Sequence, residues 1–479
     1  MIQSTEMAVV DANAEALGVP RKQLMESSGN AVARAVRASA DPGASVALVC
    51  GRGNNGGDAF VAARFLGGYD VTVHLLGRPE TISTGIAREN WTALERSEIG
   101  TRTVRDSTAL DLGDPDVVVD AMLGTGVTGA LREPEATVAR RINAADATVV
   151  SVDVPSGVDA DTGESLGIAV EPDRVVTFHD DKPGLRRIDA EVTVADIGIP
   201  EAAERFVGRG DLLRLRRDPT AHKGEFGRVL VVGGGPYTGA PALAARAALR
   251  GGADLAYVAC PESVARAVQS YGEDLIVRPQ AGDRIAPPNV PGLLDLAAGM
   301  DCVVVGPGLG DDDATLDAVA GFLEGYEGVA VVDADALSAV RDVDTGATLI
   351  CTPHAGEFEA MGGTNASDRA ERETHVAALA GELGATILSK GAVDVISDGT
   401  RTRGNRTGTP GMTVGGTGDV LAGVTGALAC VLDPIHAAAV GAYANGRAGE
   451  IVADAHGHGL VASDLLGALP GALWPEAGE

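Results

Sequence analysis

The stretch SVALVCGRGNNGGDAFVAARFL, residues 45–66, decides the fold of the first half of the chain. A β-branched run comes first, a glycine-rich turn follows it, and an alanine-rich pattern with helical spacing ends it. This is the order of a strand and the helix that crosses over to the next parallel strand. The same order recurs along both halves of the chain, so the sequence predicts an α/β protein made of two three-layer α/β/α domains.

Short apolar runs mark the expected strands. They are SVALVC, DVTVHLLG, DVVVDAMLG, TVVSVDVPSG, RVVTFHD and EVTVADIGIP in the first half, and GRVLVVGGG, ADLAYVACP, CVVVGPGLG, GVAVVDADAL, TLICTPHAG and ATILSKGAVDVISDG in the second. Between the halves the strand pattern lapses, charge density rises, and Pro200 and Pro219 border a polar stretch. We therefore expect one domain over 1–208 and a second over 209–479.

The charge of the chain limits its partners. Its 67 acidic and 38 basic residues give a formal net charge of −29, which would repel nucleic acids and anionic membranes at long range. Lysine occurs only at positions 22, 182, 223 and 390. An acidic surface poor in lysine is tolerated where salt screens self-repulsion, so a halophilic source is one hypothesis.

The location of the protein follows from three further features. The N-terminal segment carries Glu6 and Asp11 where a signal peptide needs positive charge, and no apolar run is long enough to span a membrane. The five cysteines are widely spaced within apolar runs, which predicts buried free thiols without disulfide or zinc. We therefore expect a cytoplasmic protein.

The glycine-rich turn of the first domain could bind a dinucleotide, but its context argues against a dehydrogenase. Gly51, Gly53 and Gly56 have the spacing of a dinucleotide fingerprint. The acidic residue that normally ends the next strand is missing, because Gly77 and Arg78 stand there.

Side-chain oxygens gather at several strand ends of the first domain. Asn54, Asn55 and Asp58 lie in the turn, and Asp120, Asp153 and Ser156 end later strands. Such a set could bind a phosphate and a cation together. Each aspartate taken singly is explained more simply as a helix or turn cap, but carboxyl ends of parallel strands meet at one edge, which favours a shared site.

Lys182 also ends a strand, in TFHDDKPGL. A lysine is ordinarily a solvated surface residue, yet this chain has almost none, so we expect Lys182 at the same site. The neighbouring His179 is given no role.

In the second domain the decisive stretch is GTPGMTVGGTGDVLAG, residues 408–423. Its glycines let backbone N–H groups converge where a helix presents its N-terminus, which predicts an anion site. Asp419 lies next to this expected anion site in the sequence. It either caps the helix or acts as a base that takes a proton from a hydroxyl attacking a phosphoryl group. The number of glycines favours the base, since a cap does not need them.

Other strand ends of the second domain contribute to the same site. A glycine turn precedes Ala240, GPGLG leaves Gly308 open to close approach, and TPHAGEFE places His354 at another edge. Lys390 ends a strand before a turn that could cover a nucleotide. For His354 alone, a structural and a functional role are both open.

These motifs resemble a known family. Through GNNGGD, VDAMLGTGVTG and DVPSG the first domain resembles the NAD(P)H-hydrate epimerase domain, which has a Rossmann-like fold. Through YTGAPALAARAALRGGA, GPGLG, DADAL, TPHAGEFE and GMTVGGTGDVLAG the second resembles ADP-dependent (S)-NAD(P)H-hydrate dehydratase, which has a ribokinase-like fold. Together they follow the domain order of the bifunctional nicotinamide nucleotide repair family.

The resemblance implies a function. The substrates would be NADH hydrate and NADPH hydrate, which have gained water across the nicotinamide ring. An isomerase would interconvert the R and S epimers, and a lyase would dehydrate the S form using ADP, giving AMP and phosphate. It also implies a potassium ion in the epimerase domain, magnesium with the nucleotide and a homo-oligomer.

The resemblance also implies site residues. Metal ligands would be Asn55, Asp120 and Ser156. The epimerase substrate would be held by Asn54, Asn55, Gly56, Gly57, Asp58, Gly124, Thr125, Gly126, Val127, Thr128, Gly129, Ala130 and Asp153. The dehydratase substrate would contact Ala240, Gly308, His354 and Asp419. The nucleotide would contact Lys390, Gly391, Ala392, Val393, Asp394 and Gly418. Catalytic residues would be Asp419, Asp153 and Lys182.

Small departures and two rival functions accompany this interpretation. Ala59, Ser27 and Ser28 differ from the residues usual in the family, which bears on the fit of the N-terminal helix. A ribokinase-like small-molecule kinase would share GGTGD, because a fold does not set a function. A nucleotide-binding sensor would not need the full oxygen set of the first domain.

Overall fold

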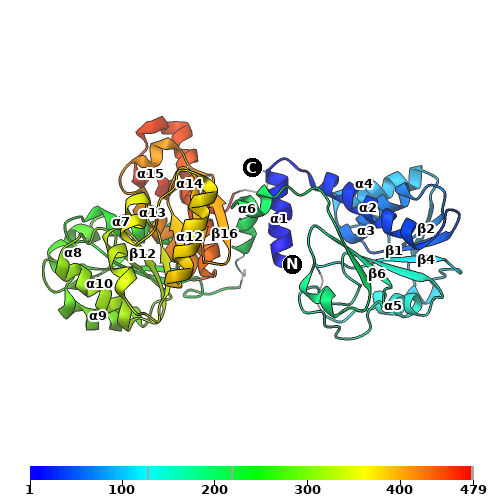
Figure 1. The fold of residues 1–479 in the computed structure, drawn as a ribbon, viewed down its shortest axis with the longest axis horizontal. Coiled ribbons are helices and arrows are strands. Elements are labelled where there is room, and N and C mark those ends of the chain that lie inside the picture. Colours follow the sequence, from blue (N-terminus) through cyan, green and yellow to red (C-terminus); the bar gives the residue numbers. More distant parts are fainter. Residues whose placement is uncertain (127–128, 216, 218–219, 476–479) are drawn as a thin grey trace. The chain divides into compact units, whose positions relative to one another are not determined.

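The chain is described from a computed structural model, which covers residues 1–126, 129–215, 217 and 220–475. It divides into two compact units, Met1–Ala203 and Glu204–Glu479, each described by itself (Figure 1). The boundary expected between 208 and 209 falls just inside the second unit.

The first unit contains a parallel sheet with strand order β3-β2-β1-β4-β5-β6-β7. Its strands are β1 (Ser45–Cys50), β2 (Asp70–Leu76), β3 (Gly100–Val104), β4 (Val117–Ala121), β5 (Thr148–Val152), β6 (Arg174–Phe178) and β7 (Glu191–Ala195). The strand order reverses between β1 and β4, which is where ligands bind in open parallel sheets. The expected parallel sheet is confirmed. Strand β3 was missed because it is mostly exposed and polar.

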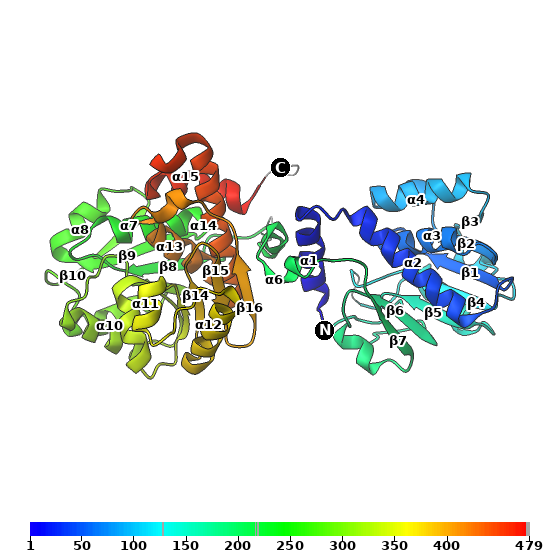
Figure 2. The same ribbon diagram turned by 45° about the horizontal axis from the view of Figure 1, so that its top comes forward.

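Helices cover both faces of this sheet (Figure 1), and Figure 2 shows those of one face from another side. They are α1 (Ser4–Ala16), α2 (Arg21–Ser39), α3 (Asn54–Phe65), α4 (Gly85–Arg96) and α5 (Glu135–Asn143), with 3₁₀ turns at Pro79–Thr81, Ser107–Ala109 and Pro183–Arg187. Apolar residues of α2, α3 and α4 pack in one core, and those of α5 pack in another. At Gly29 an added Cβ would lie 2.4 Å from Val61 Cβ, so glycine lets α2 and α3 approach.

The second unit contains a sheet with strand order β10-β9-β8-β11-β12-β13-β14-β15-β16. Its strands are β8 (Arg228–Val232), β9 (Leu255–Pro261), β10 (Leu275–Gln280), β11 (Cys302–Val305), β12 (Val329–Val332), β13 (Thr348–Cys351), β14 (Thr386–Ser389), β15 (Asp394–Ser397) and β16 (Thr402–Asn405). The last two pairings, β14 with β15 and β15 with β16, are antiparallel. The expectation of a wholly parallel sheet was wrong there, because the short turn after Ser389 leaves no room for a crossover helix. Strands β10 and β16 were also missed.

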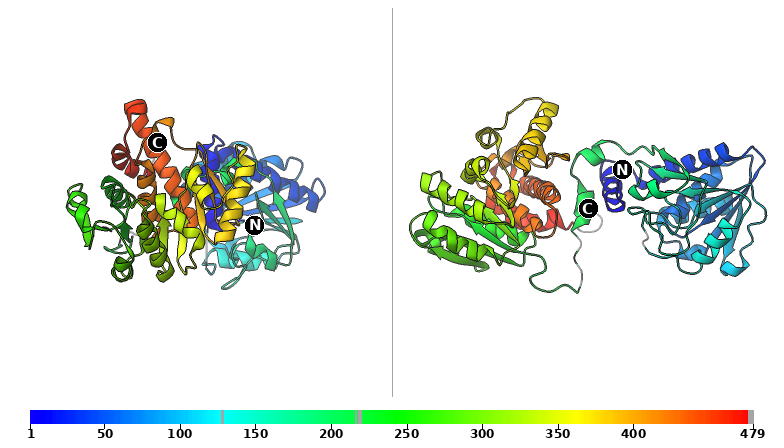
Figure 3. Two further views of the ribbon diagram at one scale, coloured as in Figure 1. Left: turned by 60° about the vertical axis from the view of Figure 1, so that its left-hand side comes forward. Right: turned by 60° about the horizontal axis from the view of Figure 1, so that its bottom comes forward.

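Two layers of helices enclose the second sheet (Figure 3). The helices are α6 (Ala202–Arg205), α7 (Gly239–Arg250), α8 (Glu262–Gln269), α9 (Val290–Ala297), α10 (Asp313–Gly325), α11 (Ala355–Ala360), α12 (Arg369–Leu383), α13 (Thr417–Ala429), α14 (Pro434–His456) and α15 (Ala462–Leu473). The 3₁₀ helices are Arg209–Arg214, Pro287–Asn289, Ala334–Asp342, Pro410–Thr413 and Gly457–Gly459. One core contains α7, α13, α14 and α15, and another contains α9, α10 and α12. The cysteines are free, as expected, and all but the half-buried Cys430 are buried.

A search of the described residues for a helix long and apolar enough to cross a membrane found none.

Candidate active sites

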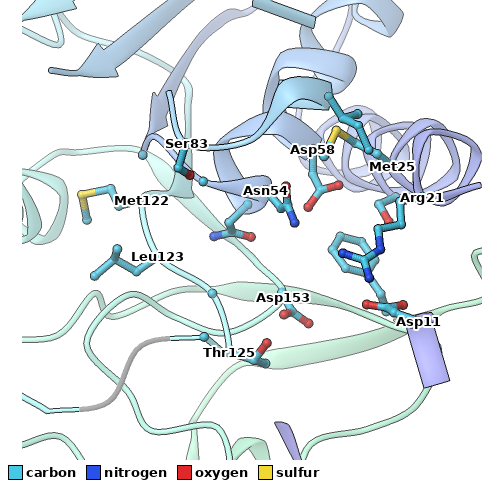
Figure 4. A pocket seen from close by; sticks show the side chains of 18 of the residues that line it. Asp11, Arg21, Met25, Asn54, Asp58, Ser83, Met122, Leu123, Thr125 and Asp153 are labelled. Carbon is cyan, nitrogen blue, oxygen red and sulfur yellow. The ribbon is translucent and has the colours of Figure 1, made fainter. Parts of the chain in front are cut away.

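The first site is a cavity of about 670 Å³ beyond the carboxyl ends of strands β1, β4, β5 and β6 (Figure 4). Its lining includes most of the polar residues that the sequence predicted there: Asn54, Asn55, Asp58, Gly124, Thr125, Gly126, Asp153 and Lys182. Val127 and Thr128 lie outside the described residues. Gly129 borders a neighbouring cavity of about 190 Å³, and Ala130 is exposed.

The glycine turn after β1 is required by close backbone contacts. An added Cβ at Gly51 would lie 1.9 Å from the Met122 carbonyl oxygen, and one at Gly56 would lie 2.1 Å from the Gly51 oxygen. Helix α3 begins at Asn54, so the two asparagines stand in its first turn at the cavity wall. Gly57 packs against Met25, where an added Cβ would lie 2.8 Å from Met25 Cε.

Asp120 lies fully buried at the end of β4, with its carboxylate surrounded by donors. It accepts hydrogen bonds from Ser156 Oγ at 2.6 Å, the Ser156 backbone N–H at 2.9 Å and Ser151 Oγ at 2.9 Å. Parallel register sets Ser151 of β5 beside Asp120. Burial raises the pKa of Asp120, although these hydrogen bonds oppose the shift.

The amide of Asn55 provides an independent sign of a ligand near Gly124, whose neighbour Leu123 donates its backbone N–H to Ser156 Oγ at 3.0 Å. Both Oδ1 and Nδ2 of Asn55 are buried and have no hydrogen-bond partner in the described part of the chain. Gly124 comes shortly after β4 in the chain, and a Cβ added at Gly124 would lie 3.5 Å from Asn55 Oδ1. An orphaned amide oxygen near a buried carboxylate and a serine hydroxyl is a donor set that fits a monovalent cation.

Asp153 follows β5 in a left-handed backbone conformation, with φ 65°. Such a conformation is strained for a residue other than glycine and often marks a functional site. The Asp153 carboxylate accepts a hydrogen bond from Thr177 Oγ1 at 3.1 Å and lies 3.5 Å from Lys182 Nζ. The sequence prediction that Asp153 and Lys182 meet at strand ends agrees with this geometry.

Lys182 is buried, and its ammonium is already occupied. It donates hydrogen bonds to Thr177 Oγ1 at 3.0 Å, the Phe178 carbonyl oxygen at 2.8 Å and the Asp180 carbonyl oxygen at 3.0 Å. An ammonium has three protons, so these acceptors account for all of them. Lys182 is therefore built to supply a fixed positive charge beside Asp153.

Three more carboxyl groups border the cavity, those of Asp58, Asp11 and Glu135 of α5. Asp58 of α3 was predicted, and burial raises its pKa well above the usual range, with Asp153 and Asp11 adding to the shift. Asp11 of α1 was not predicted, because it follows no strand. Ser28, which differs from the residue usual in the family, is buried and also lines the cavity.

The second site centres on Asp419, which is not the helix cap. Gly416 is the N-cap of α13, with φ 97°, and Asp419 lies in the first turn. An added Cβ at Gly416 would lie 2.9 Å from both Ala462 Cβ and Leu243 Cδ1, so this turn requires glycine. Burial, together with the nearby Asp333, raises the pKa of Asp419 to about 7.

Lys390 pairs with two acidic side chains near Asp419. Its Nζ lies 2.9 Å from Asp333 Oδ1 and 3.6 Å from Glu357 Oε2. Thr352 Oγ1 also donates to Asp333 Oδ1, at 2.7 Å. Burial opposes the charge on Lys390, but Asp333 and Glu357 outweigh it and raise the pKa of the ammonium. Asp333 lies in the quoted DADAL motif, yet no pattern gave it a role.

The other predicted residues occupy nearby strand ends. His354 is the N-cap of α11, where its Nδ1 accepts hydrogen bonds from the Gly356 and Glu357 backbone N–H groups. Its Nε2 lies 3.3 Å from Glu357 Oε1. The capping hydrogen bonds give His354 a structural role at the start of α11. Ala240 opens α7, and an added Cβ at Gly308 would lie 3.1 Å from Ala240 Cβ.

The predicted nucleotide turn, residues 390–394, is held by its own hydrogen bonds. The Gly391 backbone N–H donates to Asp394 Oδ1 at 2.9 Å, and Arg372 donates to the Val393 and Lys390 carbonyl oxygens. Gly418 faces this turn, because an added Cβ would lie 3.5 Å from Lys390 Nζ. Ala392 lies in the turn and is exposed.

Comparison with known proteins decides the family. Residues 21–184 match the family described as YjeF-related protein N-terminus, and residues 229–470 match NAD(P)H-hydrate dehydratase. The bifunctional NAD(P)H-hydrate repair enzyme of Methanothermobacter thermautotrophicus is 44% identical, over 99% of this chain and 96% of that protein. The enzyme of the same name from Pyrobaculum aerophilum is 45% identical, over 98% and 97%.

The chain belongs to the bifunctional NAD(P)H-hydrate repair family. A solved ribokinase-like protein from Enterococcus faecalis supports the fold of the second unit, with a TM-score of 0.50 and 23% identity over 56% of this chain and 95% of that one. The recognised resemblance is thereby confirmed for the family and for both folds.

No cluster of three or more histidine, cysteine, aspartate or glutamate side chains suited to a metal occurs among the described residues. The oxygen atoms around Asp120 do not form such a cluster, because they comprise one carboxylate and neutral oxygens.

Proposed function

We propose that the chain repairs hydrated NADH and NADPH. The first unit would interconvert the R and S hydrates, and the second would dehydrate the S hydrate with ADP, giving AMP and phosphate. The observation that carries this proposal is Asp419: a carboxyl with a pKa near 7 stands at a glycine-built helix N-terminus in a chain of the repair family.

The dehydratase half rests on a base placed beside an anion site. Asp419 would take the proton of the ring hydroxyl, whose oxygen then attacks the terminal phosphorus of ADP and displaces AMP. The lone pair of the adjacent ring nitrogen would then expel phosphate and restore the reduced nicotinamide. The N-terminus of α13 would stabilise charge on the transferring group.

The binding residues proposed for the second unit are those that the family resemblance implies. Ala240, Gly308 and His354 would contact the hydrate. Lys390, the turn at 391–394 and Gly418 would contact the nucleotide, where the Lys390 ammonium suits a phosphate. Magnesium would enter with the nucleotide phosphates.

The epimerase half rests on the cavity of the first unit. Asn54–Asp58, Gly124–Ala130 and Asp153 would hold the substrate, and Asp153 would assist loss and return of the hydroxyl through an iminium state. Asn55, Asp120 and Ser156 would hold potassium. When bound, that ion would offset the buried negative charge of Asp120 and anchor the substrate phosphates.

The location in the cytoplasm, the self-association of the chain and its halophilic source stay predictions, and so do the domain limits at 208 and 209.

One experiment tests both halves together. A mixture of R and S NADH hydrates in high potassium chloride is incubated with ADP, with ATP or without nucleotide, and recovery of NADH absorbance is followed. Full recovery with ADP supports both activities, because the R hydrate reaches the dehydratase quickly only after epimerisation. Recovery that stops near half contradicts the epimerase half. Persistent phosphorylated product without NADH would point to a kinase.

A further inference from the structure

The N-terminal helix α1 contributes to the cavity of the first unit, although no sequence motif drew attention to it. Met7 and Asp11 of α1 line the cavity, as does Arg21 at the start of α2. In Figure 4 the side chains of Asp11, Asp58 and Asp153 come from separate elements and border the same space. Asp11 is thus one of four carboxyl groups that line the cavity, with Asp58, Glu135 and Asp153.

Hydrogen bonds fix the start of α1 against the segments that precede and follow β6. The Ile2 backbone N–H donates to the Asp181 carbonyl oxygen at 2.8 Å, and the Ser4 backbone N–H donates to Asp161 Oδ1 at 2.9 Å. Near the other end, Asn13 Nδ2 donates to the Ala203 carbonyl oxygen at 3.0 Å. The position of Asp11 is therefore set by the fold.

Asp11 differs from Asp153 in its surroundings. Burial is the largest influence on Asp11 and raises its pKa to about 6; Arg21 and the more distant Lys182 and His179 oppose the shift, while Asp153 adds to it. Asp58, whose pKa Asp11 helps to raise, also faces Asp11, and Arg52 and Glu135 line the same cavity. Asp153 instead lies 3.5 Å from the Lys182 ammonium, which gives it a counter-charge. Two carboxyl groups held in different environments are suited to opposite roles in proton transfer.

Epimerisation through an iminium state needs an acid and a base. One group must protonate the departing hydroxyl, and another must take a proton from the water that adds to the opposite face. Lys182 is poorly placed for either task, since three oxygen acceptors occupy its protons. The cavity therefore needs a second titratable group beside Asp153.

We propose that Asp11 is that group and forms the acid–base pair of the epimerase site with Asp153; this inference rests on the proposed epimerase function. Asp11 donates its proton to the hydroxyl, the C–O bond breaks, and water leaves with the bonding pair while the ring nitrogen lone pair forms a C=N bond.

Water then adds to the other face, the C=N pair returns to nitrogen, and the Asp153 carboxylate takes the released proton. The proton returns from Asp153 to Asp11 through cavity water, so atoms and charge balance over the cycle. In the reverse direction the two residues exchange roles. Lys182 acts as a positioning residue that lies 3.5 Å from the Asp153 carboxylate.

The test uses the full chain with the substitution Asp11→Asn and the R hydrate as substrate. Conversion of R to S, corrected for the uncatalysed rate, is followed by chromatography. We expect kcat to fall about 10²- to 10⁴-fold with little change in KM, since a general acid or base is lost. ADP-dependent dehydration of the S hydrate in the same chain should be unchanged, which reports on folding of the second unit. Thermal unfolding reports on the first.

Glu15→Gln is the matched control. Glu15 lies one turn further along α1, is half exposed and pairs with Arg21 at 3.0 Å. The substitution removes an equal charge from the same helix and leaves Asp11 in place, so epimerisation should stay near the wild-type rate. An equal loss in both variants would mean that the charge of α1 acts at a distance, which contradicts the proposal.

The pH profile of the wild-type protein gives a test that does not depend on a variant folding. The acid must be protonated, so R-to-S conversion should decline as pH rises through the pKa of Asp11, with dehydration measured separately. Asp11→Glu should keep a declining alkaline limb and Asp11→Asn should lose it. A flat wild-type profile from about pH 5 to 9 would overturn the assignment. If the wild type shows no R-to-S conversion at all, the proposed epimerase function fails first.

Discussion

The two sites use a lysine beside a carboxylate in different ways. Lys182 in the first unit is only 1% exposed, and backbone and hydroxyl oxygens occupy its protons beside Asp153. Lys390 in the second unit is 21% exposed and is held by the carboxylates of Asp333 and Glu357. A buried lysine whose protons are all hydrogen-bonded can interact only with its fixed neighbours. A partly exposed lysine can also bind a phosphate group of a ligand. We therefore propose aspartates for the acid–base steps in both units.

The largest expected effect is the loss of one reaction while the reaction of the other site continues. Asp419→Asn should lower dehydration of the S hydrate about 10²- to 10⁴-fold, because the base is lost, while R-to-S conversion continues. Absorbance at the NADH band and chromatography of the epimers measure the two reactions in one sample. The control is Glu371→Gln, since Glu371 is an exposed acid in the first turn of α12. Retained dehydration in the Asp419 variant would remove the proposed base.

A smaller effect tests the cation site of the first unit. Ser151→Ala removes a hydrogen bond of 2.9 Å to Asp120, so the potassium concentration for half-maximal epimerisation should rise roughly 10- to 100-fold. Thr148→Ala, at the other end of β5, should leave the potassium response unchanged. Epimerisation that is equally fast with and without potassium, even in the wild type, would contradict the cation site.

The pH dependence of dehydration sharpens the comparison further. A base works only when ionised, and the pKa of Asp419 is raised to about 7 by burial and by Asp333. The kcat/KM for the S hydrate should therefore increase about tenfold per pH unit well below pH 7 and level off above it. Asp333→Asn should move this limb to lower pH, because one source of the raised pKa is removed. If the rising part of the pH profile stays at the same pH in Asp333→Asn, a group other than Asp419 controls the pH dependence.

The smallest effect concerns stability. At Gly423 of α13 an added Cβ would lie 2.0 Å from the Ala244 carbonyl oxygen of α7. Gly423→Ala should lower the free energy of unfolding by about 1–3 kcal/mol, because the helices must separate. Gly467 of α15 has nothing within 4 Å of an added Cβ, so Gly467→Ala should stabilise by about 0.5–1 kcal/mol. Denaturant unfolding of both variants measures the difference, and equal values would show that α13 can shift freely.

Much of the fold followed from short apolar runs, and the failures have physical causes. The buried strands around β1 and β8 are continuous apolar segments, so they were recognised. Strand β3 is mostly exposed and polar, and strand β16 consists of the residues TRGN, so neither edge strand contains an apolar run. The antiparallel hairpin after β14 depends on loop length, which the apolar pattern does not report.

The sequence by itself determined the family, the two α/β units and the strand-end residues, because glycine turns and β-branched runs act over a few neighbouring positions. Only the tertiary structure decided the state of each group. Asn55 was left with unpaired buried atoms, Asp419 with a pKa near 7, and Lys182 with no spare proton. Asp11 joined the first site from a helix far from any motif. Burial and hydrogen-bond partners come from segments distant in sequence, and these set the charge and the available protons of a side chain.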